Sequence, residues 1–220
     1  MADRLSSAHL RPLASFAVPT ISQQEALKRL APHCDALFQI VTNPWNEYHA
    51  LMPREFLIAF GPKSRANNIH DLMLRDAGRY ASKAEGNVRM FQRQLMKGIV
   101  IDDIALRLKK LNEDSLSRGH YTKQVEEFRE QKQLDGIDAT HHLELGYVLN
   151  EDETEQAEVR LACPSGKGVA WWSRIDRSGI QPVVLDLFPA DGDPSADGGA
   201  IIKPKERAVV VPMRRKSDES

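Results

Sequence analysis

Clustered cations are the side chains of this sequence with the clearest chemistry. Six of them recur at spacings that would align them along a helix or a strand: Arg75, Arg79, Lys83, Arg107, Lys109 and Lys110. The first three lie four residues apart, as on one helix face, and strand alternation would turn Arg107 and Lys109 to one side. Such cations could line a groove for the phosphates of a nucleic acid, because neutralising phosphates releases counterions. Solvated helix and strand faces are the alternative.

A second candidate group lies in the run CPSGKGVAWWSRID. Its Gly-Lys turn joins two strand-like runs, which places Lys167 at the tip of a hairpin. Since neighbours on a strand face opposite ways, we expect Trp171 to be buried and Trp172 to share the other face with Arg174. Pairing the core faces sets Arg160 opposite Trp172. Trp172 is then either covered by that arginine or, with Lys167 and Arg174, a platform for a base or a partner side chain.

Catalytic and metal-binding patterns are weaker in this sequence. Asp102 and Asp103 are adjacent at a turn, where aspartate is favoured for its own sake, and the sequence leaves open whether they bind a metal. His141 and His142 would diverge on a strand, and two ligands do not make a metal site. Cys163 has no histidine nearby in the sequence and is expected to be a small core residue. We therefore predict no catalytic residue, no metal and no cofactor.

Composition limits the class of protein. The chain has 220 residues, 41% hydrophobic and 28% charged, as in a soluble globular protein. No apolar run reaches the length of a membrane span, and two distant cysteines suit a reducing compartment, so we predict a cytoplasmic protein without a membrane partner. The net charge of −1 conceals an uneven distribution of charge along the chain. Residues 61–123 carry thirteen Lys/Arg and seven Asp/Glu, whereas residues 124–163 carry three and eleven. These segments either face each other or leave a basic face for a polyanion.

The elements that must position these residues can be read from local signals. Residues 1–61 read as a helical part, with a capping box from Ser22 to Glu25, a break at Pro32, and a new helix started by Asn43 and Pro44. Residues 62–186 read as an α+β core. Its elements are a helix over 64–83, strand-like runs within 87–111, a helix from about 122, a strand over 141–149, and a hairpin of 154–163 with 169–175.

The last part of the chain, residues 187–220, reads as a loop, a strand over 200–212 and a polar basic tail. The whole is therefore predicted to be an α+β protein. It has a helical N-terminal part, a helix–three strands–helix–strand core, an added β-hairpin and a C-terminal strand.

The order of elements over about residues 64–150 resembles the PD-(D/E)XK superfamily of restriction-endonuclease-like proteins. That resemblance implies a metal-binding aspartate on the second strand and an acidic-x-Lys pair on the third. Here the third strand reads Arg107-Leu108-Lys109, with arginine at the acidic position, and Asp102 and Asp103 stand at the turn between the second and third strands. A cation at that position would repel Mg²⁺. The resemblance thus leaves three possibilities: an active nuclease, a degenerate non-catalytic version, or an unrelated fold with the same order.

Three functional hypotheses follow from these observations. The leading one is a non-enzymatic protein that binds nucleic acid, or a complex containing it, through the cations above, as an accessory of bacterial defence or of a toxin–antitoxin system would. The alternative is a protein-interaction module that acts through the acidic segment and the strand over 200–212, the latter by adding to a sheet edge. The third is the metal-dependent nuclease.

Overall fold

The computed structural model describes residues 20–118 and 122–182 of the chain. These residues belong to one compact unit, Met1–Leu185, and a second unit, Asp186–Ser220, lies outside them. Helices open the described chain: α1 (Gln23–Leu30), the 3₁₀ turn η1 (Ala31–His33), α2 (Cys34–Leu51), α3 (Arg54–Ala59) and α4 (Pro62–Ala81). Strands and one helix follow: β1 (Val88–Arg93), β2 (Met96–Ile101), β3 (Ile104–Lys110), α5 (Lys123–Arg129), β4 (His141–Leu149), β5 (Gln156–Ser165), β6 (Gly168–Asp176) and β7 (Gly179–Pro182).

The seven strands form one sheet in chain order, from β1 to β7. Neighbouring strands are antiparallel except β3 and β4, which are parallel. A parallel pair needs a crossover connection, and here the segment between β3 and β4, which contains α5, supplies it. Ile104 lies opposite His141 and Lys110 opposite Tyr147, so the crossover returns the chain to the end of the sheet where β3 begins.

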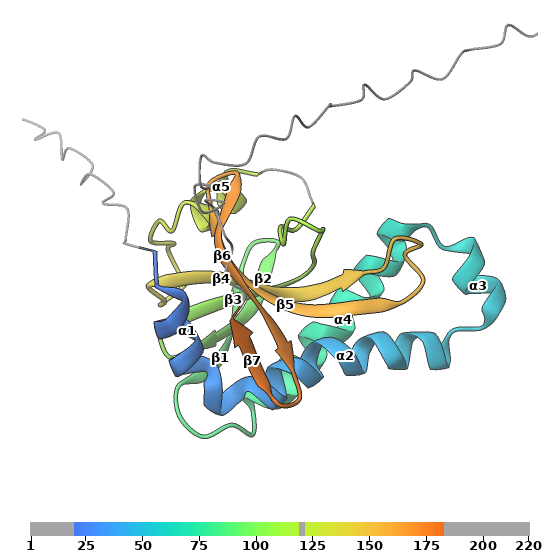
Figure 1. The fold of residues 1–220 in the computed structure, drawn as a ribbon, viewed down its shortest axis with the longest axis horizontal. Coiled ribbons are helices and arrows are strands. Elements are labelled where there is room, and N and C mark those ends of the chain that lie inside the picture. The colour runs from blue at the N-terminus through green and yellow to red at the C-terminus, as the bar shows by residue number, and fades with distance from the viewer. Residues whose placement is uncertain (1–19, 119–121, 183–220) are drawn as a thin grey trace, which may run out of the picture. The chain divides into compact units, whose positions relative to one another are not determined.

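Each face of the sheet has its own hydrophobic core. On one face, called the helix face, α1, α2 and α4 pack against the apolar side chains of β2 to β6 (Figure 1). On the other, the crossover face, Phe128 of α5 packs with Val100 and Phe91. The Phe91 ring lies against Gly98, where an added Cβ would come within 2.6 Å of it. The two-residue period of the strands supplies one layer of side chains to each core.

Local sequence signals explain where the helices begin. The Ser22 hydroxyl accepts a hydrogen bond from the amide of Glu25 at 3.2 Å, as predicted for an N-cap. Pro32 falls within η1, which separates α1 from α2, so the predicted break is confirmed. Thr122 caps α5 by accepting from the amide of Val125.

The predicted start of a new helix at Asn43 and Pro44 is wrong. α2 continues through Pro44, which is buried within it. The proline ring removes one backbone hydrogen bond from the helix. Apolar residues on both sides of it, including Val41 and Tyr48, nevertheless bury in the helix-face core. Tertiary packing therefore outweighs the local preference of the proline.

The α+β class and the order of elements from α4 to the β5–β6 hairpin are as predicted. The helical part shares one hydrophobic core with the sheet, and β7 is an additional strand that the sequence analysis did not include. The predicted strand over 200–212 and the tail lie outside the described residues. Within residues 20–118 and 122–182, no helix combines the length and apolar character needed to cross a bilayer.

Candidate functional site

Among the described residues, five ion pairs join the basic segment, 61–123, to the acidic segment, 124–163. They are Arg89–Asp138, Arg93–Glu127, Arg107–Glu144, Lys110–Glu153 and Lys123–Glu127. Their N–O distances range from 2.7 Å in Lys110–Glu153 to 3.9 Å in Lys123–Glu127. The interpretation that the two segments face each other is therefore confirmed. Much of the excess positive charge of one segment is neutralised by the excess negative charge of the other.

The three cations of α4 and its C-terminal end have different surroundings. Arg75 donates two hydrogen bonds to the carboxylate of Glu47 on α2, at 2.7 and 2.6 Å. These bonds raise the pKa of the Arg75 guanidinium above its ordinary value. Arg79 contacts Asp76 at 3.2 Å and stays largely exposed, and Lys83 lies exposed after the helix. Arg75 thus ties α4 to α2, and its charge is already matched.

The expectation that Arg107 lines an exposed groove is wrong, because only 8% of its side chain is exposed. Its guanidinium donates to Glu144 at 3.0 Å and lies 5.4 Å from the centre of the Phe128 ring. Lys109 is half-buried, and burial lowers its pKa. Lys110 points to the opposite face and pairs with Glu153. Arg107 is buried and Lys110 already pairs with Glu153, so these cations of β3 do not join those of α4 in one open cationic surface.

A buried cluster of polar side chains on the crossover face is centred on Glu144. Its Oε1 accepts hydrogen bonds from Arg107 at 3.0 Å and from the Ser117 hydroxyl at 2.9 Å, and its Oε2 accepts from the Ser117 amide at 2.9 Å. Arg129 of α5 lies 3.5 Å from Oε1 and donates to the Ser117 carbonyl at 2.7 Å. The Glu144 cluster therefore connects β3, β4, α5 and the loop between them.

The residue types of the Glu144 cluster would suit catalysis, but its burial does not. Arg107, Ser117 and Arg129 are 6%, 8% and 7% exposed, and Glu144 is fully buried. Burial lowers the pKa of the Arg107 guanidinium, while the Glu144 charge acts in the opposite direction. An arginine stays protonated in proteins, so the pair remains ionic. A substrate would reach these groups only if the crossover opened, and we assign the cluster a structural role.

His142 is buried beside the Glu144 cluster and is neutral at neutral pH. Its Nδ1 lies 3.1 Å from the Phe128 carbonyl, which can only accept, so Nδ1 carries the proton. The imidazole stacks on the Phe128 ring with centroids 4.6 Å apart, and burial lowers its pKa to about 4. Gln131 bonds both the amide and the carbonyl of His142 at 2.9 Å and the Pro164 carbonyl at 3.1 Å. These bonds fasten the crossover to β4 and β5.

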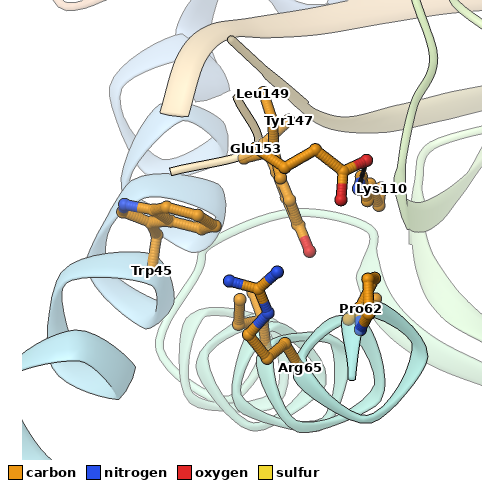
Figure 2. A pocket seen from close by; sticks show the side chains of 9 residues that line it. Trp45, Pro62, Arg65, Lys110, Tyr147, Leu149 and Glu153 are labelled. Carbon is orange, nitrogen blue, oxygen red and sulfur yellow. Dashed lines mark hydrogen bonds and ion pairs between the residues drawn. The ribbon is translucent and has the colours of Figure 1, made fainter. Parts of the chain in front are cut away.

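A small cavity lies on the helix face between α2, α4 and the ends of β3 and β4. Figure 2 shows Arg65 reaching toward the Tyr147 hydroxyl, with Trp45 on one side and Lys110 and Glu153 on the other. Burial raises the pKa of the Tyr147 phenol, and the Arg65 charge acts in the opposite direction. The cavity measures about 10 Å³, which is close to the space that one water needs. It is too small for a substrate.

A much larger groove, of about 420 Å³, lies where α4 passes β1. It is lined by residues of α4, β1 and β2: Asp71, Leu74, Arg75, Met90, Phe91, Gln92 and Lys97. Among the strands of residues 20–118 and 122–182, β1 is the first of the sheet and pairs with β2 alone, so alternate backbone N–H and C=O groups of β1 point away from the sheet. Sequence reasoning missed this groove because the strand order, which makes β1 an edge, is not visible in a single sequence.

The β5–β6 hairpin carries the remaining predicted residues. Lys167 lies exposed in its two-residue turn. Trp172 is half-buried, and the Arg160 guanidinium lies over its ring, 4.2 Å from the ring centre. Arg174 is half exposed and pairs with Glu158 at 3.2 Å. The interpretation in which Arg160 covers Trp172 is confirmed.

The predicted register of this hairpin is wrong by two residues, because Trp172 lies opposite Ala162 and not opposite Arg160. The register shifts where β6 has one extra residue, Ala170, at a bulge. A shift of two residues keeps each side chain on its predicted face. Trp171 is therefore buried as predicted, and its indole N–H donates to the Ile21 carbonyl at 2.8 Å.

The carboxylates at the β2–β3 turn have separate surroundings. Asp102 is exposed and has a positive φ of 53°. Asp103 accepts a hydrogen bond from Arg29 of α1 at 2.6 Å and lies 3.8 Å from His141. In the part of the chain that the structure describes, no three His, Cys, Asp or Glu side chains gather so as to hold a metal ion. Cys163 is buried, which raises the pKa of its thiol to about 12.

Comparisons of this chain with family models, with curated proteins and with solved structures found no match. The resemblance to the PD-(D/E)XK superfamily, the cytoplasmic location and the link to bacterial defence therefore stay predictions. The position at which that resemblance expects a carboxylate holds Arg107, whose charge is matched by Glu144.

The Glu144 cluster makes a prediction about stability. Glu144→Gln keeps the shape of the side chain but leaves the buried charge of Arg107 unmatched, so we expect a loss of about 3–5 kcal/mol in the free energy of unfolding. Glu153→Gln, in a pair whose carboxylate is 43% exposed, should cost less than about 1 kcal/mol. Urea unfolding of the three proteins measures both values. Equal effects of the two substitutions would show that burial does not set the strength of the Arg107–Glu144 pair.

His142 makes a prediction about pH. Its pKa is about 4 in the folded protein and about 6.5 in the unfolded chain, so the unfolded chain binds more protons between these values. Stability from this residue is therefore complete above pH 6.5 and falls by about 3 kcal/mol as the pH drops to about 4. In His142→Gln the decline over this window should be smaller, because the buried titrating group is gone. Urea unfolding at a series of pH values tests this, and identical pH profiles would contradict it.

Proposed function

We propose that this protein is a protein-interaction module that receives an extended segment of a partner protein along β1. The observation that supports this function is an open groove of about 420 Å³ beside β1, which the described part of the chain pairs on one side only. Backbone groups at such a sheet edge form hydrogen bonds readily with an added strand. The partner strand would satisfy these groups and would direct alternate side chains into the groove.

The residues around the groove select the chemistry of the partner segment. Leu74 and Met90 offer apolar contact, and Met90 is 38% exposed. Two of the three cations in residues 88–101, Arg89 and Arg93, already pair with carboxylates of the protein. Lys97, which lines the groove, is exposed and forms no ion pair with any residue that the structure describes. An extended segment that alternates apolar and acidic residues is therefore the best complement.

The acidic segment of this chain is a weaker candidate surface than the sequence indicates. Glu127, Asp138 and Glu153 already pair with the basic segment.

The test begins with short random peptides displayed on phage and selected on the full chain. We expect the selected peptides to alternate apolar and acidic residues and to bind with micromolar affinity in calorimetry. Met90→Asp should weaken binding at least about tenfold, because it removes an apolar contact and adds a like charge. Hydrogen exchange should slow at alternate amides of β1 in the complex.

Ile58→Asp is the matched control, since it places the same charge at an exposed apolar position on α3, away from β1. It should leave the affinity of the peptides unchanged. Peptides that bind Met90→Asp as tightly as the wild type, or that leave β1 exchange unaltered, would rule out β1 as the recognition surface.

A second candidate function, binding of single-stranded nucleic acid, is favoured by the β5–β6 hairpin. Lys167 is exposed at its turn, and Trp172 and Arg174 share one face of β6. One base stacked on an aromatic ring contributes about 1–3 kcal/mol. Arg160 already occupies one side of the Trp172 ring, so a base would use the remaining exposed part or displace the arginine.

If the hairpin binds nucleic acid, Trp172→Ala should weaken binding of an oligothymidylate by about tenfold, because a stacking contact is lost. Lys167→Ala should lower the slope of log affinity against log salt by about one. Fluorescence anisotropy at several salt concentrations measures both effects, with Arg54→Ala on α3 as the control. Absence of binding at low salt, or equal binding by Trp172→Ala, would exclude the hairpin as a nucleic-acid site.

A further inference from the structure

A buried tyrosine hydroxyl lies at the small cavity between α2, α4 and the ends of β3 and β4. Tyr147 is only 1% exposed, yet its hydroxyl forms no hydrogen bond with any residue in the ranges 20–118 and 122–182. Figure 2 shows this side chain directed from β4 toward Arg65, into the cavity that both residues line. Burial raises the pKa of the phenol, so the hydroxyl keeps its hydrogen. A buried O–H group that is aimed into such a space needs an acceptor there.

Arg65, near the start of α4, brings an unmatched positive charge to the same cavity. Its side chain is half-buried, and within the part of the chain that the structure describes it forms no ion pair or hydrogen bond. Of the residues that line the cavity, Arg65 and Lys110 are cationic and Glu153 alone is anionic. The Glu153 carboxylate is bonded to Lys110 at 2.7 Å. One positive charge is therefore left over at the wall of the cavity.

The N-terminal end of α4 adds to the positive potential. This helix of 20 residues begins at Pro62, which also lines the cavity. No side chain of the described residues caps the helix, and its first turn has no acidic residue. The free backbone N–H groups at a helix N-terminus act as about half a positive elementary charge. The surroundings of the cavity therefore favour an anion over a neutral water molecule.

We propose that this cavity is a binding site for a small monovalent anion of the size of chloride, held by Arg65 of α4 and the Tyr147 hydroxyl of β4. The cavity of about 10 Å³ accepts one particle of about the size of water, and chloride is only slightly larger. Sulfate and phosphate are too large, and the Glu153 carboxylate repels a second negative charge. The bound anion joins α4 to the sheet and stabilises the folded protein. The site shares no residue with the β1 groove and does not depend on the proposed function.

The NMR line width of chloride in a solution of the full chain tests the proposal, because an ion that exchanges with a protein site relaxes faster. We expect excess broadening that bromide removes by competition and that sulfate at equal ionic strength leaves in place. Arg65→Gln and Tyr147→Phe should each weaken chloride binding about tenfold, because each removes a donor to a charged acceptor. Arg54→Gln removes an equal charge at an exposed position on α3 and should bind chloride like the wild type.

A substitution of the opposite sign separates an anion site from a merely structural role of these residues. Glu153→Gln should raise the affinity for chloride severalfold, because it removes a negative charge and frees Lys110. Chloride should also raise the urea midpoint of the wild type more than that of Tyr147→Phe, which lacks only the hydroxyl oxygen. No excess broadening would show that the cavity holds water alone and would overturn the proposal. Broadening that persists in Arg65→Gln, displacement of chloride by sulfate as readily as by bromide, or weaker binding by Glu153→Gln would overturn it as well.

Discussion

The fold depends on one buried ionic contact, between Arg107 of β3 and Glu144 of β4. These are the two parallel strands, and only a crossover connection can bring them together. The same carboxylate anchors the crossover connection. Ser117 donates two hydrogen bonds to Glu144, and Arg129 lies beside Glu144 and donates to the Ser117 carbonyl. Two apolar side chains of similar size would stabilise the sheet about as well. The charges add a requirement for one particular alignment of β3, β4 and α5, since any other leaves a charge buried without its partner.

The same contact shows what a single sequence can and cannot predict. Strand alternation placed Arg107 and Lys109 on one face correctly. The partner of Arg107 is 37 residues away, and its identity depends on which strands pair. A signal for it was nevertheless present. Leu-Arg-Leu and Leu-Glu-Leu stand in two strand-like runs joined by a helix, each with a charge between residues that must be buried.

Charge counting along the chain was informative about ion pairing within the protein. An excess of cations in one segment and of anions in the next indicates either a ligand or an internal match, and five ion pairs show the internal match. The groove beside β1 could not be predicted from composition. Its lining comes from α4, β1 and β2, and none of these segments is unusual in composition. Edge position is a property of strand order, and strand order is set by long-range packing.

The two edges of the sheet differ in their ability to accept another strand. β7 contains Pro182, whose nitrogen has no hydrogen to donate. A proline on an edge strand blunts the edge. β1 has six residues and no proline, and it is flanked by a groove. Arg89 and Arg93 of β1 are matched by Asp138 and Glu127, so they do not guard this edge by repulsion. Lys97 beside the groove has no ion-pair partner among the described residues, and it is the cation that would attract an acidic segment to this edge.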